Sequence, residues 1–595
     1  MTRLLERLRT LPAPQWAIQT ALPLVGYAAF TLVWIGRGVV LHPTTKVLGN
    51  ADRDKTILMW SFRWWPHAIA HGHDPFVANV VWAPHGVDLA WVTSSPTLAL
   101  VLSPLTAAFG PVFSYNFAAL AAPPLAAWTA YLLARRLTGN IPASLVAGFL
   151  FGFSPYVISQ SVTHLNLSFV CLVPLAGLLA VRFFEGSLGR WRYAAFLALV
   201  LALQFGISTE IFATLTLFAV ICFVLAAFLL DSRTRLAALG RYTALAYLAT
   251  GVVVTPYLYH AFVSGSEPVR RLAHQHGLDL ANIFIPTETT WLRLPGSDAI
   301  TSTFTSGLPE LGGYVGLPLL LILVLAVLME RGAKMRRGVW MLALAALAAY
   351  VLAVGIKVTI DGEKAGTGVW TLIERLPAIG AAIPIRLVMY AALFAALVTA
   401  VWLAQPGPRR GRFVLAGVAV ICFLPTPSAA FWTSRVHEPR FFATSVYRDY
   451  IRPGERALVL PYVERDSWSM LWQAETGFRF SMIGGHIGQA IIPAECGWAG
   501  VWSSFAGGAP HGGPGRIRRF LLSHGVNVII EGVETGAWSK LLIKAALPDI
   551  TPVSAAGVKV YWLPHGLSRD LPRDGPTVVP PLRLKNAIGR AVCGR

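Results

Sequence analysis

The sequence predicts a mainly α-helical, polytopic membrane protein, with a bundle of about eleven transmembrane helices and a small α/β domain outside the membrane. Of the 595 residues, 55% are hydrophobic and only 13% are charged, whereas a soluble protein carries about a quarter charged residues. In addition, Lys and Arg gather in short connections between long apolar runs. This charge placement follows the positive-inside rule of membrane proteins.

Apolar runs close to the ~20 residues needed to cross a bilayer recur through the first 430 residues. Three arginines precede the first run and no small-residue cleavage signature follows it, so we expect an uncleaved first span. The expected spans are 17–40, 113–134, 142–160, 167–184, 193–209, 211–230, 242–262, 314–329, 339–356, 385–404 and 412–430.

Charge also predicts the topology of these spans. With the N-terminus in the cytoplasm, every cytoplasmic connection is basic, whereas the outer connection 263–313 carries mixed charge. Residues 95–110 are apolar but short and contain two prolines. A span there would invert every later connection, so we expect an interfacial or re-entrant segment. The basic connections hold Arg135 and Arg136; Arg190 and Arg192; Arg233, Arg235 and Arg241; Arg331, Lys334, Arg336 and Arg337; and Arg409, Arg410 and Arg412.

The odd number of spans places residues 431–595 outside the cytoplasm. Strand-like and helix-like runs alternate over 431–568, which predicts a small extracytoplasmic α/β domain after a membrane module over 1–430. The tail 569–595 is basic and Pro-rich and is expected to be loosely ordered. The runs are the strands 457–463, 526–532 and 558–563 and the helices 516–524 and 537–547.

Charge and cysteine content narrow the possible partners. The formal net charge is +20, but its place in short connections between apolar runs indicates a membrane rather than nucleic acid. Two cysteines, Cys496 and Cys593, fall in the polar C-terminal region and would allow one disulfide. No clustered Cys/His spacing suggests a structural zinc site. Nothing in the sequence indicates an oligomeric state.

The first outer loop, roughly 43–112, is the most informative stretch for chemistry. It is much longer than an ordinary connection and is rich in Asp, His, Trp and Pro. Its cluster Trp60, Trp64 and Trp65 predicts an amphipathic helix lying in the membrane interface, with direct stacking on a sugar as the alternative.

Two acids open this loop, Asp52 and Asp54. A carboxylate is a suitable general base for a hydroxyl that attacks an activated carbon. The alternative is that both acids are solvated and paired with Arg53, Lys55 or Arg63.

Further polar residues fall at the outer ends of several expected spans, at the depth of Asp54. Ionisable groups at span ends that point into a bundle are candidates for function. Each also has a structural alternative, such as snorkelling for Arg386 or a helix cap for Glu310. These residues are His164, Asn166, Glu210, Glu310 and Arg386.

Several stretches resemble the GT-C superfamily of membrane glycosyltransferases, and more closely a little-characterised group of bacterial multi-pass proteins within it. The similar stretches run through about 45–400, and the C-terminal domain matches only loosely. They are DKTILMWSFRWWPHAIAHGHDPF, WAPHGVDLAW, GFSPYVISQSVTHLNL, LANIFIPTETT, ELGGYVGLP and the less distinctive LPAIGAAIPIRLVMY.

This resemblance implies an enzyme of a bacterial cytoplasmic membrane. GT-C enzymes transfer a sugar from a polyprenyl-phosphate carrier at the outer face, usually with inversion, and an acid of the first outer loop acts as base. The implied acceptor is an envelope glycan, a lipid or an exported protein. Most users of such donors need no metal, so we expect neither a metal nor a cofactor beyond the donor itself.

The resemblance also implies residue roles. Asp54 stands six residues before the first Trp of the WxxxWW run, as the acid of that group does, and is the expected general base, with Asp52 as a possible second acid. We expect Arg386 and His164 to bind the donor phosphate. The residues expected to bind sugar or acceptor are Glu210, Asn166, Glu310 and His85.

Two other functions remain open from the sequence. A transporter or flippase for lipid-linked sugars would also need many spans and a lipid-phosphate site, although the long first loop and the lack of an internal repeat disfavour it. A member without catalytic activity that binds glycan as a scaffold is the other.

Overall fold

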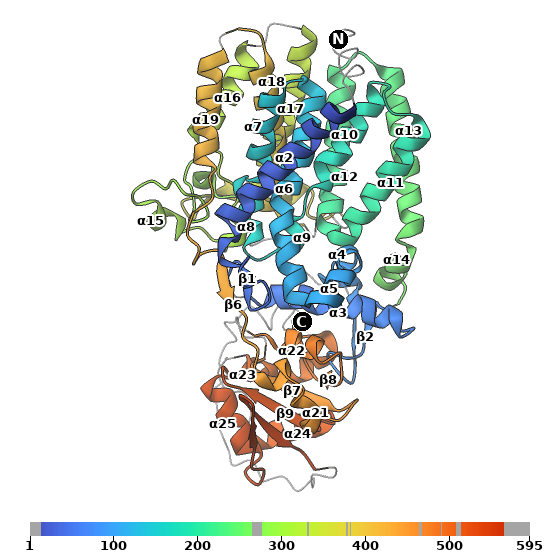
Figure 1. The fold of residues 1–595 in the computed structure, drawn as a ribbon, viewed down its shortest axis with the longest axis vertical. Helices are drawn as coiled ribbons and strands as arrows, with labels where there is room; N and C mark the ends of the chain where they lie inside the picture. The colour runs from blue at the N-terminus through green and yellow to red at the C-terminus, as the bar shows by residue number, and fades with distance from the viewer. Residues whose placement is uncertain are drawn as a thin grey trace.

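Figure 1 shows an upright bundle of long helices with a smaller α/β part beneath it. This computed structural model describes residues 13–50, 52–264, 276–329, 333–376, 379–380, 382–407, 409–462, 467–488, 491–506 and 513–564. The predicted tail 569–595 and Cys593 lie outside these residues.

Every expected span has a helical counterpart. Eight helices of the described residues are long and apolar enough to cross a membrane, and the bent pair α7 (Ile141–Gly152) and α8 (Pro155–Ser161) would make nine. The expected number was about eleven. The difference arises because two runs form helices of only 14 residues, α16 (Gly316–Met329) and α19 (Arg409–Cys422), which are about 21 Å long.

Most of the long helices overlap the expected ranges well, and the largest offset is at α13, which runs over Arg233–Val253 where 242–262 was expected. They are α2 (Ala13–Trp34), α6 (Pro111–Thr138), α9 (Leu165–Ser168) continued by α10 (Leu172–Phe184), α11 (Arg190–Ile207), α12 (Thr209–Leu229), α13 (Arg233–Val253), α17 (Ala333–Ala353) and α18 (Val388–Ala404). The segment 95–110 forms two short helices, α4 (Pro96–Val101) and α5 (Ser103–Phe109). Neither is long enough to cross a bilayer.

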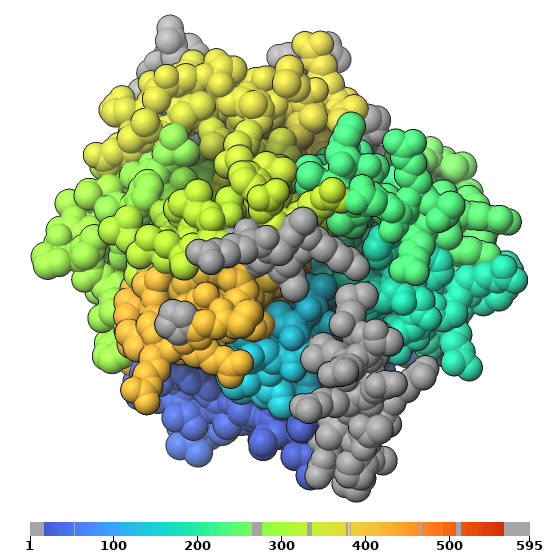
Figure 2. All heavy atoms as spheres, turned by 90° about the horizontal axis from the view of Figure 1, so that it is seen from above, coloured from blue at the N-terminus to red at the C-terminus, as the bar shows by residue number. Residues whose placement is uncertain are grey.

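The basic connections lie together at one end of the bundle, onto which Figure 2 looks. Arg135 donates to the carbonyl oxygen of Gln19 near the start of α2, at 3.3 Å. Arg136 forms an ion pair with Glu185 at 2.6 Å, and Arg337 forms one with Asp231. The α/β part lies at the opposite end of the bundle (Figure 1).

The C-terminal part contains one five-stranded sheet in the order β10-β11-β9-β7-β8. Strand β7 (Arg456–Leu460) lies between β8 (Ser481–Met482) and the central strand β9 (Val528–Gly532) and runs parallel to both, whereas β11 (Val558–Trp562) runs antiparallel to β9. The remaining edge strand is β10 (Val553–Ala555), and the main helices are α22 (Ser469–Glu475), α24 (Pro514–Ser523) and α25 (Ala537–Ala546). The expected α/β pattern is therefore confirmed.

The first outer loop joins the bundle to this sheet through a shared hydrophobic core. Its helix α3 (Arg53–Ala70) packs against α22, and its buried residues belong to the same cluster as those of β7 and β9. A second link is the antiparallel pair β1 (Lys46–Leu48) and β6 (Thr433–Arg435).

The three tryptophans of the first loop are core residues rather than interfacial anchors, which corrects the sequence-based expectation. Trp60, Trp64 and Trp65 are each at most 3% exposed. The Trp60 ring N–H donates to Gln473 of α22 at 2.8 Å. Large aromatic side chains find more contact area between two packed parts than at a surface, and their burial also removes them as platforms for a sugar.

Candidate functional site

The turn that precedes α3 fixes the position of Asp54. Asp52 is the N-cap of α3, and its carboxylate accepts from the backbone N–H of Asp54 at 2.9 Å, as N-cap aspartates do. Gly49 has a φ of +81°, and a side chain there would meet the carbonyl oxygen of Val162 at 2.1 Å. The fully buried Lys55 donates to the carbonyl oxygen of Leu48 at 2.6 Å. Asp52 is therefore a structural helix cap, and Asp54 lies on the first turn of α3.

Two histidines from distant segments hold the Asp54 carboxylate. Nε2 of His486, in the C-terminal part, lies 2.6 Å from Oδ1. Nε2 of His164, between α8 and α9, lies 3.4 Å from Oδ2. Burial would raise the pKa of Asp54, but hydrogen bonds to both imidazoles and their charge lower it well below its usual range. The side chain remains 41% exposed, so it is an ionised carboxylate that an incoming group can reach.

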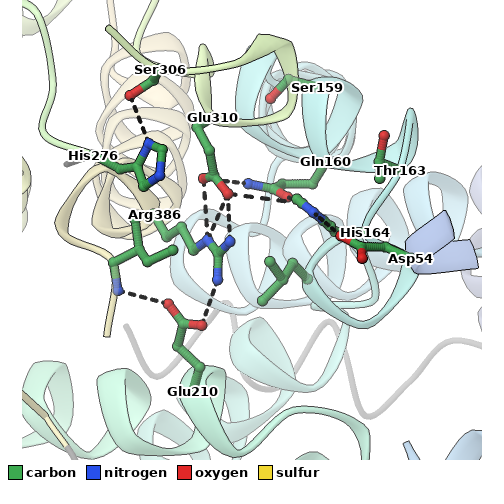
Figure 3. A network of polar contacts seen from close by, with 12 residues as sticks. Asp54, Ser159, Gln160, Thr163, His164, Glu210, His276, Ser306, Glu310 and Arg386 are labelled. Atoms are coloured by element: carbon green, nitrogen blue, oxygen red, sulfur yellow. Dashed lines mark hydrogen bonds and ion pairs between the residues drawn. The ribbon is translucent and has the colours of Figure 1, made fainter. Parts of the chain in front are cut away.

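A buried chain of side chains leads from this carboxylate into the bundle (Figure 3). Nδ1 of His164 lies 2.8 Å from Oε1 of Gln160. The amide nitrogen of Gln160 donates to Glu310 at 3.1 Å. With this amide orientation, which is assigned from the network, Nδ1 of His164 carries a hydrogen.

The chain ends in a buried ion triad. The Arg386 guanidinium donates through Nε to both carboxylate oxygens of Glu310, at 3.0 and 3.1 Å, and through Nη1 to Glu210 at 2.5 Å. All three side chains are at most 8% exposed. Burial would raise the pKa of Glu310, but the charge of Arg386 lowers it to about 2. The triad has one cation for two anions, so it retains a negative charge when all three groups are ionised.

The structure therefore joins five of the expected residues into one network: Asp54, His164, Glu310, Arg386 and Glu210. Two others lie elsewhere. Asn166 lies within α9, two residues after His164, and His85 lies 3.3 Å from Glu495 of the C-terminal part. Their expected roles in acceptor binding stay predictions.

Two members of the network were not expected from the sequence. Gln160 precedes His164 by four residues, and this spacing puts both on one side of a helical turn, so the pattern SQSVTHL could have revealed it. His486 lies in the Gly-rich stretch IGGHIG of the C-terminal part. No pattern there indicates that the ring reaches a residue 432 positions earlier.

Among the described residues, no group of three His, Cys, Asp or Glu side chains is arranged to hold a metal ion. The network instead offers an accessible carboxylate, two imidazoles and a guanidinium with unused N–H groups, because Arg386 carries five N–H donors. These groups suit proton removal from a hydroxyl and contact with an anion.

Comparison with known protein families assigns the chain to one of them. Residues 24–424 match a domain of unknown function, DUF6311. The chain belongs to this family. No curated protein matches it.

Solved structures show which fold this DUF6311 member has. The oligosaccharyltransferase of Archaeoglobus fulgidus has a TM-score of 0.52 and 13% identity, over 97% of this chain and 77% of that one. The arabinofuranosyltransferase AftD from Mycobacteria has a TM-score of 0.53 and 15% identity, over 93% of this chain and 40% of AftD. The DUF6311 chain thus has the fold of the GT-C membrane glycosyltransferases and spans less than half of AftD.

Proposed function

We propose that this DUF6311 protein is a glycosyltransferase that moves a sugar from a polyprenyl-phosphate donor to a hydroxyl acceptor. The observation that carries the proposal is the Asp54 carboxylate, which two histidines keep ionised where the bundle meets the C-terminal part. The fold supports it, because two structures that share it are named as glycosyl-transferring enzymes.

The proposed step is a single displacement at the anomeric carbon. The acceptor oxygen attacks that carbon as its proton moves to Asp54, and the bond from carbon to the phosphate oxygen breaks. The electron pair of the broken bond leaves on polyprenyl phosphate, and the configuration of the sugar inverts. Asp54 suits this step because it is ionised before the acceptor arrives.

The donor phosphate is proposed to bind between His164 and Arg386. Arg386 is the buried cation of the network, and developing charge on a leaving phosphate is stabilised by N–H groups that are already oriented. Glu210 and Glu310 fix the guanidinium plane through their hydrogen bonds. The main role of the two carboxylates is therefore to orient Arg386. The carboxylate lone pairs that Arg386 does not use would accept hydrogen bonds from sugar hydroxyls.

The deciding experiment measures sugar transfer from polyprenyl-phosphate sugars to envelope material, in membranes with equal amounts of wild type or Asp54→Asn. Asparagine keeps the size of the side chain but cannot accept the proton, so we expect a loss of about 10²–10⁴-fold, the usual contribution of a general base. Asp74→Asn is the matched control, because Asp74 lies in the same loop and pairs with His260 at 3.0 Å outside the network.

Equal transfer by wild type and Asp54→Asn would remove Asp54 from the reaction. Lipid-linked sugar that crosses the bilayer without any transfer would favour the flippase function instead.

The orientation of the chain is part of the proposal, because the donor sugar would be used at the face that carries the C-terminal part. The basic connections lie at the other end of the bundle, which is the cytoplasmic end under the positive-inside rule. A reporter fused after residue 595 should be active only outside the cytoplasm, whereas one inserted at Gly186 should be active only inside. The opposite pair of results would invert the topology.

A further inference from the structure

The Asp54 contact with His486 crosses from the first outer loop to the C-terminal part. His486 follows β8 in the stretch 484–488, which contains three glycines. Its ring is 6% exposed, and Nε2 lies 2.6 Å from Oδ1 of Asp54. The shortest hydrogen bond to the candidate base thus comes from outside the helix bundle.

A ladder between the two parts sets the backbone that carries His486. The N–H of Met482 donates to Val80 at 2.8 Å, the N–H of Ala83 donates to Met482 at 3.0 Å, and the N–H of Trp82 donates to Gly484 at 3.3 Å. Residues 80–83 of the first loop therefore extend the edge of the sheet beyond β8. The loop that holds Asp54 and the segment that holds His486 are built against each other.

Close packing leaves this backbone little room. A side chain at Gly484 would come within 2.6 Å of the Tyr462 ring and 3.1 Å of the Trp502 ring. On the side of α3, Gln473 accepts from Trp60 and donates to the carbonyl oxygens of Val80 and Phe480, at 2.5 and 3.0 Å. Both ends of the contact are thus anchored in one buried framework.

The ring of His486 has one polar partner among the described residues. Its Nδ1 is buried and finds none there, so the cost of burying the imidazole is offset at Nε2 alone. Among the described residues, the other titratable groups near Asp54 include Asp52, Tyr115 of α6 and His164. Of these, only His164 also contacts the carboxylate through its side chain.

We propose that His486 is a positioning residue of the active site, supplied by the C-terminal part, and that its Nε2–H holds the Asp54 carboxylate toward the acceptor. The site is then complete only when this part is seated on the first outer loop. The proposal rests on the proposed function for its kinetic consequence, but the His486–Asp54 contact can be measured without turnover.

The test uses four variants of the full chain: His486→Ala, His486→Gln, His486→Asn and His524→Ala. Gln can place an N–H where Nε2–H stood, whereas Asn reaches only as far as Nδ1. His524 is the matched control, because it is equally buried in the C-terminal part and pairs with Glu495 at 2.8 Å, away from Asp54. Loss of that pair lowers stability and leaves the side-chain contacts of Asp54 in place.

Two readouts are compared. The first is an infrared titration of the Asp54 carboxyl, isolated by subtraction of the Asp54→Asn spectrum, which needs no substrate. We expect its pKa to rise by about one to two units in His486→Ala, because a hydrogen bond to a charged group contributes about 1.5–3 kcal/mol. The second is transfer, for which kcat should fall about 10–100-fold with KM little changed. The acid limb of the pH–rate profile should move to higher pH.

The variants separate the outcomes. His486→Gln should recover most of the loss. His486→Asn should not restore the wild-type curves. His524→Ala should not reproduce the curves of His486→Ala. An unchanged Asp54 titration in His486→Ala would overturn the proposal. A shifted titration in a protein whose wild type transfers no sugar would keep the His486 contact and reject the glycosyltransferase function.

Discussion

The network contains two acid clusters that differ in exposure and in charge balance. At the end near the C-terminal part, one carboxylate, Asp54, faces two imidazoles and stays 41% exposed. Deeper in the bundle, two carboxylates, Glu210 and Glu310, share one guanidinium and are at most 8% exposed. The first cluster leaves its acid open to a reactant, whereas the second satisfies its acids internally.

The difference shows that an exposed acid and a buried ion triad contribute to one site in different ways. Arg386 lies in the short turn η7 (Pro384–Leu387) just before α18, Glu210 lies in the first turn of α12 and Glu310 precedes α16. The buried triad therefore links the ends of three helices. Breaking a buried ion pair costs stability because an uncompensated charge remains. Changes at Asp54 should act mainly on rate, whereas changes in the triad should act on folding and, at Arg386, also on donor binding.

The largest expected effect on stability is from Arg386→Met, which leaves two buried carboxylates without their cation. We expect about 3–5 kcal/mol of destabilisation, the usual cost of an unpaired buried charge, measured by denaturant unfolding in nanodiscs. Glu310→Gln should cost less, because it leaves one guanidinium with one carboxylate. Arg293→Met is the matched control, since its pair with Asp298 is exposed. Equal costs for all three variants would show that the triad does not fasten the helices.

The sequence predicted the bundle well because a bilayer constrains the length of each apolar run and the placement of charge around it. Both features can be recognised in a short stretch of sequence. The same logic placed Asp54, His164, Glu210, Glu310 and Arg386 at one depth. Depth alone could not show that Arg386 lies between two acids, since that depends on how helices far apart in the chain pack. The triad thus depends on tertiary packing, which the residue types allow but do not determine.

Two features of the site could not be predicted from the sequence, for a different reason. His486 and the burial of Trp60 both depend on how the C-terminal sheet seats on the first outer loop. Amphipathic spacing in α3 is the same whether a membrane interface or a protein surface covers the apolar face, so the sequence could not choose between them.

An intermediate effect is expected from Gln160→Met, which removes the link between the two clusters. Gln160 is fully buried and joins His164 to Glu310. Leaving these partners unsatisfied should cost about 1–3 kcal/mol. Gln204→Met is the matched control, because the amide of Gln204 is buried without a partner among the described residues, so methionine there should cost nothing.

A double-mutant cycle of Gln160→Met with Arg386→Lys then tests whether the clusters communicate. Coupled clusters should deviate from additivity by about 0.5–3 kcal/mol, as linked networks do. Additive costs would show that Gln160 only fills space, and the two clusters would then be independent.

The smallest effect expected is on the acid side of the stability curve. The pKa of Asp54 is lower in the folded protein than in the unfolded chain, because His164 and His486 outweigh the effect of burial. Its contribution to stability is therefore fully present above the ordinary aspartate pKa of about 3.9, and it is lost as pH falls through the folded-state value. Asp54→Asn should flatten the curve below about pH 4, whereas Asp298→Asn, at a mostly exposed acid, should follow wild type. If Asp54→Asn kept the wild-type slope, the two histidines would stabilise the fold without stabilising this carboxylate. The contrast between the exposed Asp54 and the buried triad would then no longer hold for Asp54.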